Sequence, residues 1–103
     1  MSDVIEKEYV FIVQNESKGS YRCGYCLTDS EYVEKTRLLR EKGYFLLRSF
    51  RVRTSDSLPV LAVCTDFVEG SVQGRNGNSP LDTLDDIIDE INEELGFKIE
   101  RVA

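Results

Sequence analysis

Residues 44–68, YFLLRSFRVRT followed by SDSL and PVLAVCTDFV, decide the fold of this chain. Residues 44–54 and 59–68 are both rich in β-branched, aromatic and other apolar residues, a composition typical of strands. The connector, residues 55–58, is too short for the helical crossover that two parallel strands need. The stretch therefore predicts an antiparallel hairpin.

On the N-terminal side, the sequence predicts two strands and a helix. Residues 8–14 and 21–28 have strand composition and are separated by the turn-forming segment 15–20. Thr28 and Glu31 have the spacing of a capping box, in which each side chain bonds a backbone N–H near the other residue. We therefore expect a helix to begin near Asp29 and to end before Gly43.

On the C-terminal side, the sequence predicts a glycine-rich loop, a helix and a closing strand. Ser79 followed by Pro80 is a preferred helix start, and Gly96 is a preferred stop. Between them, one apolar stripe repeats at helical spacing. Its members are Leu84, Ile87, Ile88, Ile91 and Leu95. Residues 97–102 alternate in polarity and predict a last strand.

From residue 21 onward the predicted order is β-α-β-β-α-β, which defines an α+β ferredoxin-like plait. Residues 8–14 would add an extra N-terminal strand, and both helices would lie on one face of the sheet. We expect residues 1–103 to form a single domain. Apolar residues on both sides of 60–68 predict that both faces of the sheet are covered, one of them by a second subunit in a homodimer.

Composition excludes several classes of function. The 103 residues carry a net charge of −6 and no histidine, so the usual general base and the commonest metal ligand are absent. No apolar run approaches the ~20 residues that span a bilayer. Three cysteines are an odd number, and the N-terminus is too polar for a signal peptide, so we expect a cytoplasmic protein. We expect neither a metal nor a cofactor.

The charge is segregated along the chain. Residues 22–53 hold eight basic and four acidic residues, whereas residues 54–103 hold three basic and eleven acidic ones. The overall acidity argues against direct binding of nucleic acid, which needs a dense basic surface. The basic strand with Arg48, Arg51 and Arg53 is a second surface that acidic groups of a partner could use.

Cys23 and Cys26 form the motif Cys-Gly-Tyr-Cys, with the spacing of a thiol–disulfide exchange site. The motif resembles that of glutaredoxins and thioredoxin-like proteins. Leu58-Pro59-Val60 lies where such proteins keep a proline before a strand, and the resemblance spans residues 8–95. It implies a thioredoxin-like fold and a thiol–disulfide oxidoreductase, with Cys23 as nucleophile and Cys26 as resolving thiol.

Two physical points oppose that alternative. The capping box starts the helix after Cys26, whereas a redox pair needs the helix to begin at Cys23. A thioredoxin-like sheet also places a helical crossover between the second strand and the proline strand, and residues 54–58 cannot supply one. If the motif lies on a strand instead, the period of two sends Cys23 and Cys26 to opposite faces, where they cannot bond. They would then be reduced structural residues.

The function that the sequence favours is a small, non-enzymatic interaction module, such as an inhibitor or regulator. The second helix carries acids and no base, so it would bind a basic surface of a partner protein. The predicted partner-binding residues are Asp82, Asp85, Asp86, Asp89, Glu90 and Glu93.

Overall fold

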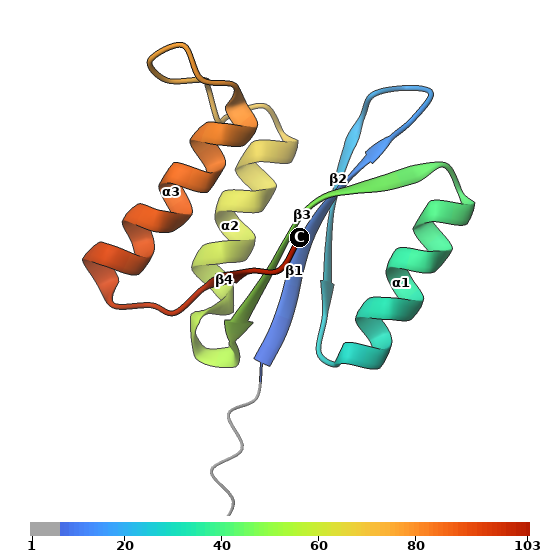
Figure 1. The fold of residues 1–103 in the computed structure, drawn as a ribbon, viewed down its shortest axis with the longest axis horizontal. Coiled ribbons are helices and arrows are strands. Elements are labelled where there is room, and N and C mark those ends of the chain that lie inside the picture. Colours follow the sequence, from blue (N-terminus) through green and yellow to red (C-terminus); the bar gives the residue numbers. More distant parts are fainter. Residues whose placement is uncertain (1–6) are drawn as a thin grey trace, which may run out of the picture.

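The computed structural model describes residues 7–103, which form one four-stranded sheet between two helical layers (Figure 1). The strands are β1 (Lys7–Asn15), β2 (Tyr21–Cys26), β3 (Tyr44–Arg53) and β4 (Glu100–Arg101). The helices are α1 (Asp29–Glu41), α2 (Ser57–Val68) and α3 (Pro80–Leu95), with a short 3₁₀ turn at Thr54–Asp56. Helix α1 lies on one side of the sheet, and α2 and α3 lie on the other.

The sheet has the order β2-β1-β3-β4, and all neighbouring strands are antiparallel. β1 is one of the two inner strands: it pairs with β2 along Tyr9–Gln14 and with β3 along Lys7–Asn15. The register between β1 and β3 shifts at Ile12/Val13, where Leu47 is the additional residue of a β-bulge.

β1 is buried on both faces, because helices cover each of them. Residues 9–13 expose 8% of their surface or less. Val10 and Ile12 pack in one cluster with residues of β3, α2 and α3. Tyr9, Phe11 and Val13 pack in a second cluster, with Cys26 and with side chains of α1. Because side chains alternate between the two faces of a strand, β1 contributes residues to two separate cores.

Helix α1 begins where the capping box predicts. The Thr28 hydroxyl oxygen accepts a hydrogen bond from the Glu31 N–H at 3.1 Å, and the Glu31 carboxylate accepts one from the Leu27 N–H at 3.3 Å. After the helix, Gly43 adopts a φ of +90°, which glycine adopts without steric cost. The prediction for this helix is confirmed.

Helix α3 also has its predicted bounds. The Ser79 hydroxyl oxygen accepts a hydrogen bond from the Asp82 N–H at 3.2 Å, Pro80 occupies the first turn, and Gly96 ends the helix in the left-handed conformation. Leu84 and Ile88 are buried against the sheet.

The predicted hairpin of residues 44–68 is wrong, because residues 57–68 form helix α2. Val60, Cys64 and Phe67 recur at helical spacing and are all buried against the sheet. Pro59 lies in the first turn, where its missing N–H would have no partner within the helix. Burial of one helical stripe on the sheet outweighs the strand propensity of the valines.

Two further predictions fail with the hairpin. The order after β2 is α-β-α-α-β, so the β-α-β-β-α-β order of a ferredoxin-like plait is not formed, although the class is α+β. The two predicted helices lie on opposite faces of the sheet rather than on one. The thioredoxin-like alternative is not observed either, since Pro59 lies inside α2 and not before a strand.

The ends of the sheet differ from the predictions in detail. The predicted strand 97–102 shortens to Glu100–Arg101, although Val102 still donates to the Ser49 carbonyl oxygen at 2.8 Å. Both faces of the sheet are covered by helices of this chain, so the argument for a second subunit no longer applies.

Within residues 7–103, no helix has the length and apolar character needed to cross a bilayer.

The packing of α3 predicts a sharp contrast between two leucines of that helix. Leu84 is fully buried, whereas Leu95 exposes 61% of its surface. Leu84→Ala should lower the free energy of unfolding by about 2–5 kcal/mol, because it leaves a cavity in the core. Leu95→Ala, the matched control, should change it by less than about 0.5 kcal/mol. Urea titrations followed by circular dichroism measure both, and equal losses would contradict the packing of α3.

Candidate functional site

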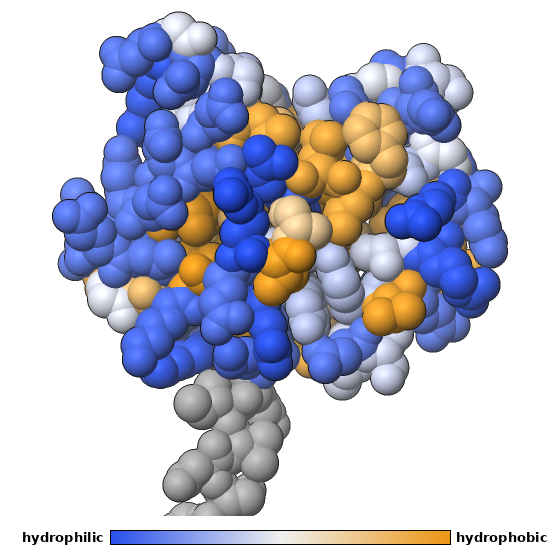
Figure 2. Space-filling model, viewed as in Figure 1, coloured by the Kyte–Doolittle hydropathy of each residue, from blue (hydrophilic) through white to orange (hydrophobic). Residues whose placement is uncertain are grey.

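The outer face of α3 carries a continuous line of carboxylates, which we call the acidic stripe. Its members are Asp82, Asp86, Asp89 and Glu93. They follow the spacing i, i+4, i+7 and i+11, which places them on one side of a helix over ~16 Å. All four are exposed, on the side of α3 opposite to Leu84 and Ile88. The surface over α3, at the left of Figure 2, is mainly hydrophilic.

None of the four carboxylates of the acidic stripe forms an ion pair with any residue in 7–103. Neighbouring members are about 5–6 Å apart at their Cβ atoms, so the like charges reinforce one another's potential. The helix dipole favours Asp82, which lies in the first turn, and opposes Glu93 near the C-terminus. The arrangement concentrates negative charge without an ion pair to any of the described residues, although Asp82 lies close enough to Arg48 to help raise the pKa of that guanidinium.

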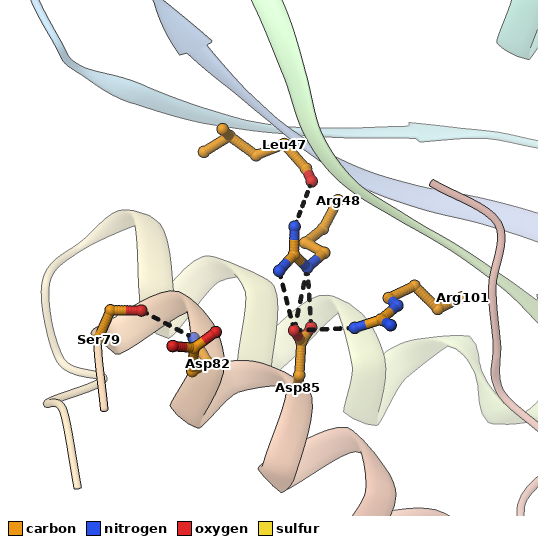
Figure 3. Close-up of polar contacts among 6 residues, drawn as sticks. All are labelled: Leu47, Arg48, Ser79, Asp82, Asp85 and Arg101. Carbon is orange, nitrogen blue, oxygen red and sulfur yellow. Dashed lines mark hydrogen bonds and ion pairs between the residues drawn. The ribbon is translucent and has the colours of Figure 1, made fainter. Parts of the chain in front are cut away.

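Asp85, which the sequence grouped with these acids, has a structural role instead. Its carboxylate points toward the sheet and accepts hydrogen bonds from Arg48 Nε at 2.9 Å and from Arg101 at 2.9 Å (Figure 3). Only 16% of its side chain is exposed. The bond from Arg48 to Asp85 raises the pKa of the guanidinium further. Asp85 therefore anchors α3 to β3 and is not available to a partner.

Glu90 is intermediate between Asp85, which anchors α3, and the acids of the stripe, which form no ion pair within the described part of the chain. Its carboxylate pairs with Arg75 of the glycine-rich loop at 3.0 Å, and both side chains are about half exposed. A pair of this kind contributes about 1 kcal/mol at most. Glu90 can therefore exchange Arg75 for a partner's cation at small cost.

The predicted basic surface on β3 is divided between the two faces of the sheet. Arg48 faces α3 and is occupied by Asp85. Arg51 faces the other side, where its guanidinium lies 6.0 Å from the centre of the Tyr9 ring. Arg53 is exposed at the end of the strand. The period of two along β3 places Arg48 on the opposite side from Arg51 and Arg53, so these three side chains do not form one patch.

Cys23 and Cys26 both lie on β2 and face opposite sides, as the strand alternative predicts. Cys23 packs against the α2 side and Cys26 is buried on the α1 side. All three cysteines are free thiols. The neighbour of Cys23 is Cys64 of α2, which sequence reasoning did not pair with it. The helical spacing of Val60, Cys64 and Phe67 is the signal that could have placed Cys64 on the sheet.

The two thiols titrate differently. Cys64 donates a hydrogen bond to the Cys23 sulfur, which lowers the pKa of Cys23 and raises the pKa of Cys64. Burial adds to the rise at Cys64 and raises the pKa of Cys26 as well. Across residues 7–103, no group of three His, Cys, Asp or Glu side chains has the arrangement of a metal site.

Comparisons with protein-family models, with curated proteins and with solved structures found no match to this chain. The geometry itself offers two chemically distinct features: an exposed line of carboxylates on α3, and a partly exposed thiol whose pKa is lowered by its neighbour.

The anchoring role of Asp85 predicts a stability difference between adjacent residues. Asp85→Ala should lower the free energy of unfolding by about 1–3 kcal/mol, because the half-buried Arg48 guanidinium loses its charged acceptor. Asp86→Ala removes an exposed carboxylate one position along the same helix and should change stability by less than about 0.5 kcal/mol. Denaturant titration of both variants distinguishes anchor from surface acid, and equal effects would refute the assignment.

The thiol pair predicts a pH dependence of alkylation. Because the pKa of Cys23 is lowered, its thiolate forms at a lower pH than that of an ordinary cysteine, and iodoacetamide should label Cys23 before Cys26 and Cys64. Cys64→Ala removes the donated hydrogen bond, so the midpoint of the rate profile should move to higher pH. Mass spectrometry of labelled peptides gives the profile, with Cys26→Ala as control. An unchanged midpoint in Cys64→Ala would rule out the pairing.

Proposed function

We propose that this protein is a non-enzymatic interaction module that binds a basic surface of a partner protein through the acidic stripe of α3. The single observation that carries the proposal is the exposure of four aligned carboxylates, none of which forms an ion pair within residues 7–103. Inhibition or regulation of that partner would follow from covering its basic surface.

The proposal is supported by the different roles of Asp85 and of the acidic stripe in the fold. Asp85 is held by two arginines of the sheet, so the anchoring of α3 does not require the acids of the stripe. Leu84 and Ile88, on the apolar side of α3, are buried in the core, so the surface that α3 offers a partner is mainly its charged side. Charged surfaces of this kind accelerate association and select partners more than they add affinity.

The partner that fits is a protein with several lysines or arginines spaced along a groove or helix. A surface that normally binds nucleic acid has this character, because it faces regularly spaced phosphates. The proposal places the protein in the cytoplasm, in keeping with its three free cysteines.

The proposal predicts that reversing the stripe abolishes fast association. The immobilised protein is used to capture partners from cell lysate, in parallel with the variant Asp86→Lys, Asp89→Lys and Glu93→Lys. Association rates of each captured protein are then measured across salt concentrations. The variant should associate about tenfold more slowly or worse at low salt, because steering is lost. The rate for the unaltered protein should fall as salt rises, since screening acts over ~10 Å at 0.1 M.

A matched control distinguishes the effect of reversing the stripe from the effect of changing the net charge. Glu16→Lys, Glu34→Lys and Glu69→Lys change the net charge by the same amount at exposed, dispersed positions. This control should keep most of the association rate. The proposal fails if every captured protein binds the two variants alike, or if capture retains no basic protein that depends on the stripe.

A further inference from the structure

The outer edge of β2 is an unpaired strand edge on the side of the molecule away from α3. β2 is the terminal strand of the sheet, with β1 as its single partner among residues 7–103. The Asn15 N–H donates to the Ser20 carbonyl oxygen at 2.8 Å and the Asn15 carbonyl oxygen accepts from the Gly19 N–H at 2.8 Å, so Asn15 directs both backbone groups toward β2, as a residue of a hydrogen-bonded pair does. Such pairs alternate along an antiparallel ladder, so Tyr21, Cys23 and Tyr25 turn their backbone groups outward.

One of these outward groups already has a cationic partner. Lys35 Nζ of α1 donates to the Tyr25 carbonyl oxygen at 2.7 Å, as the alternation requires. The outward N–H groups of Tyr21 and Cys23 receive no hydrogen-bonding partner from residues 7–103. Unpaired groups of this kind form a template for an added strand.

A cavity of about 220 Å³ opens beside this edge, between β2 and α1. Its apolar lining comes from Phe11 and Val13 of β1 and from Leu38 and Leu39 of α1. Gly24 allows the Phe11 ring to pack directly against the β2 backbone, because a Cβ at that position would lie 2.2 Å from the ring, and Phe11 is 1% exposed. The cavity is smaller than the ~300–1,000 Å³ typical of small-molecule sites. Its size suits a single apolar side chain.

The rim of the cavity is cationic, in a protein of net charge −6. Arg22 and Lys42 lie toward one end of β2 and Lys35 toward the other, beside Tyr25. None of the three forms an ion pair with a carboxylate in residues 7–103. Arg22 lies 5.6 Å from the centre of the Tyr44 ring and Lys35 bonds the Tyr25 carbonyl, so both are held at the rim. Cations without a carboxylate partner at both ends of an apolar cavity complement an apolar group that is flanked by acids.

We propose that the groove between β2 and α1 binds an extended acidic peptide segment, which adds a strand to the edge of β2. In an extended segment, alternate side chains point to the same side. One apolar side chain enters the cavity, and the side chains two positions before and after it reach the cations. The recognised pattern is therefore Asp/Glu-x-apolar-x-Asp/Glu, with affinity from main-chain hydrogen bonds and specificity from the alternate side chains.

The test uses synthetic peptides of the form acetyl-Thr-Glu-Thr-X-Thr-Asp-Thr-amide, in which X is Val, Leu, Ile, Met or Phe. Each is titrated into isotope-labelled protein and followed by NMR. At least one peptide should shift the amide signals of Tyr21, Cys23 and Lys35 and slow hydrogen exchange at the Cys23 N–H. Peptides with Lys in place of both acids, or with X as Ser, should bind at least about tenfold more weakly.

Protein variants locate the site. Arg22→Glu with Lys42→Glu should weaken peptide binding by about tenfold, the change that 1.4 kcal/mol produces. Arg53→Glu with Lys98→Glu makes the same charge change at exposed positions elsewhere and should leave binding within about twofold. An unchanged amide spectrum away from the substituted residues shows that each variant is folded.

Three results would overturn the proposal. The first is that no peptide of the set binds at millimolar concentration. The second is that the peptides bind but shift amides outside β2 and α1, or bind both double variants equally. The third is that the Cys23 amide becomes protected in the protein alone as its concentration rises, which would assign the edge to a second copy of this chain.

Discussion

The burial of β1 on both faces determines where all three helices pack. A strand with no exposed face needs cover on each side of the sheet, and one chain of this length supplies it with α1 on one side and α2 with α3 on the other. Val10 and Ile12 serve one core while Phe11 and Val13 serve the other. The helices are therefore fixed relative to a single strand, and so are the surfaces they present.

Charge is divided by the same architecture. The acidic stripe lies on the outer side of α3, whereas Arg22, Lys35 and Lys42 surround the groove between α1 and β2, on the other side of the sheet. These two surfaces do not neutralise each other, because they lie on opposite sides of the sheet. The ion pair between Arg48 and Asp85 links α3 to the sheet and leaves the stripe free. Two surfaces of opposite charge therefore lie on opposite sides of one small domain.

Local signals in the sequence are sufficient to predict the helices whose starts are specified by capping residues. Thr28 with Glu31, and Ser79 with Pro80, specify helix starts through bonds within one turn, so both helices were predicted within a residue or two. The strands β1 and β2 followed from composition and the turn between them. The β2 position of Cys23 and Cys26 correctly predicted that they face opposite sides.

The errors arose where tertiary contacts override local preference. Residues 59–68 are apolar at nearly every position, and a short apolar run does not distinguish a buried strand from a helix. Only the sheet face that Val60 and Phe67 cover decides the matter. Asp85 and Asp89 are the same residue type on the same helix, but the rotation of α3 against β3 turns one inward. The Cys23–Cys64 contact and the groove beside β2 also depend on partners distant in sequence.

The most direct test of this account is an NMR measurement of which helix each side of β1 contacts. Nuclear Overhauser effects should connect the methyl groups of Val10 and Ile12 to side chains of α2 or α3. Those of Val13 should connect only to the other side, where α1 lies. Residues 59–68 should show helical chemical shifts in the same spectra. Strand-like shifts for residues 59–68 with cross-strand contacts to β3, or contacts of α1 and α3 with one face of β1, would contradict it.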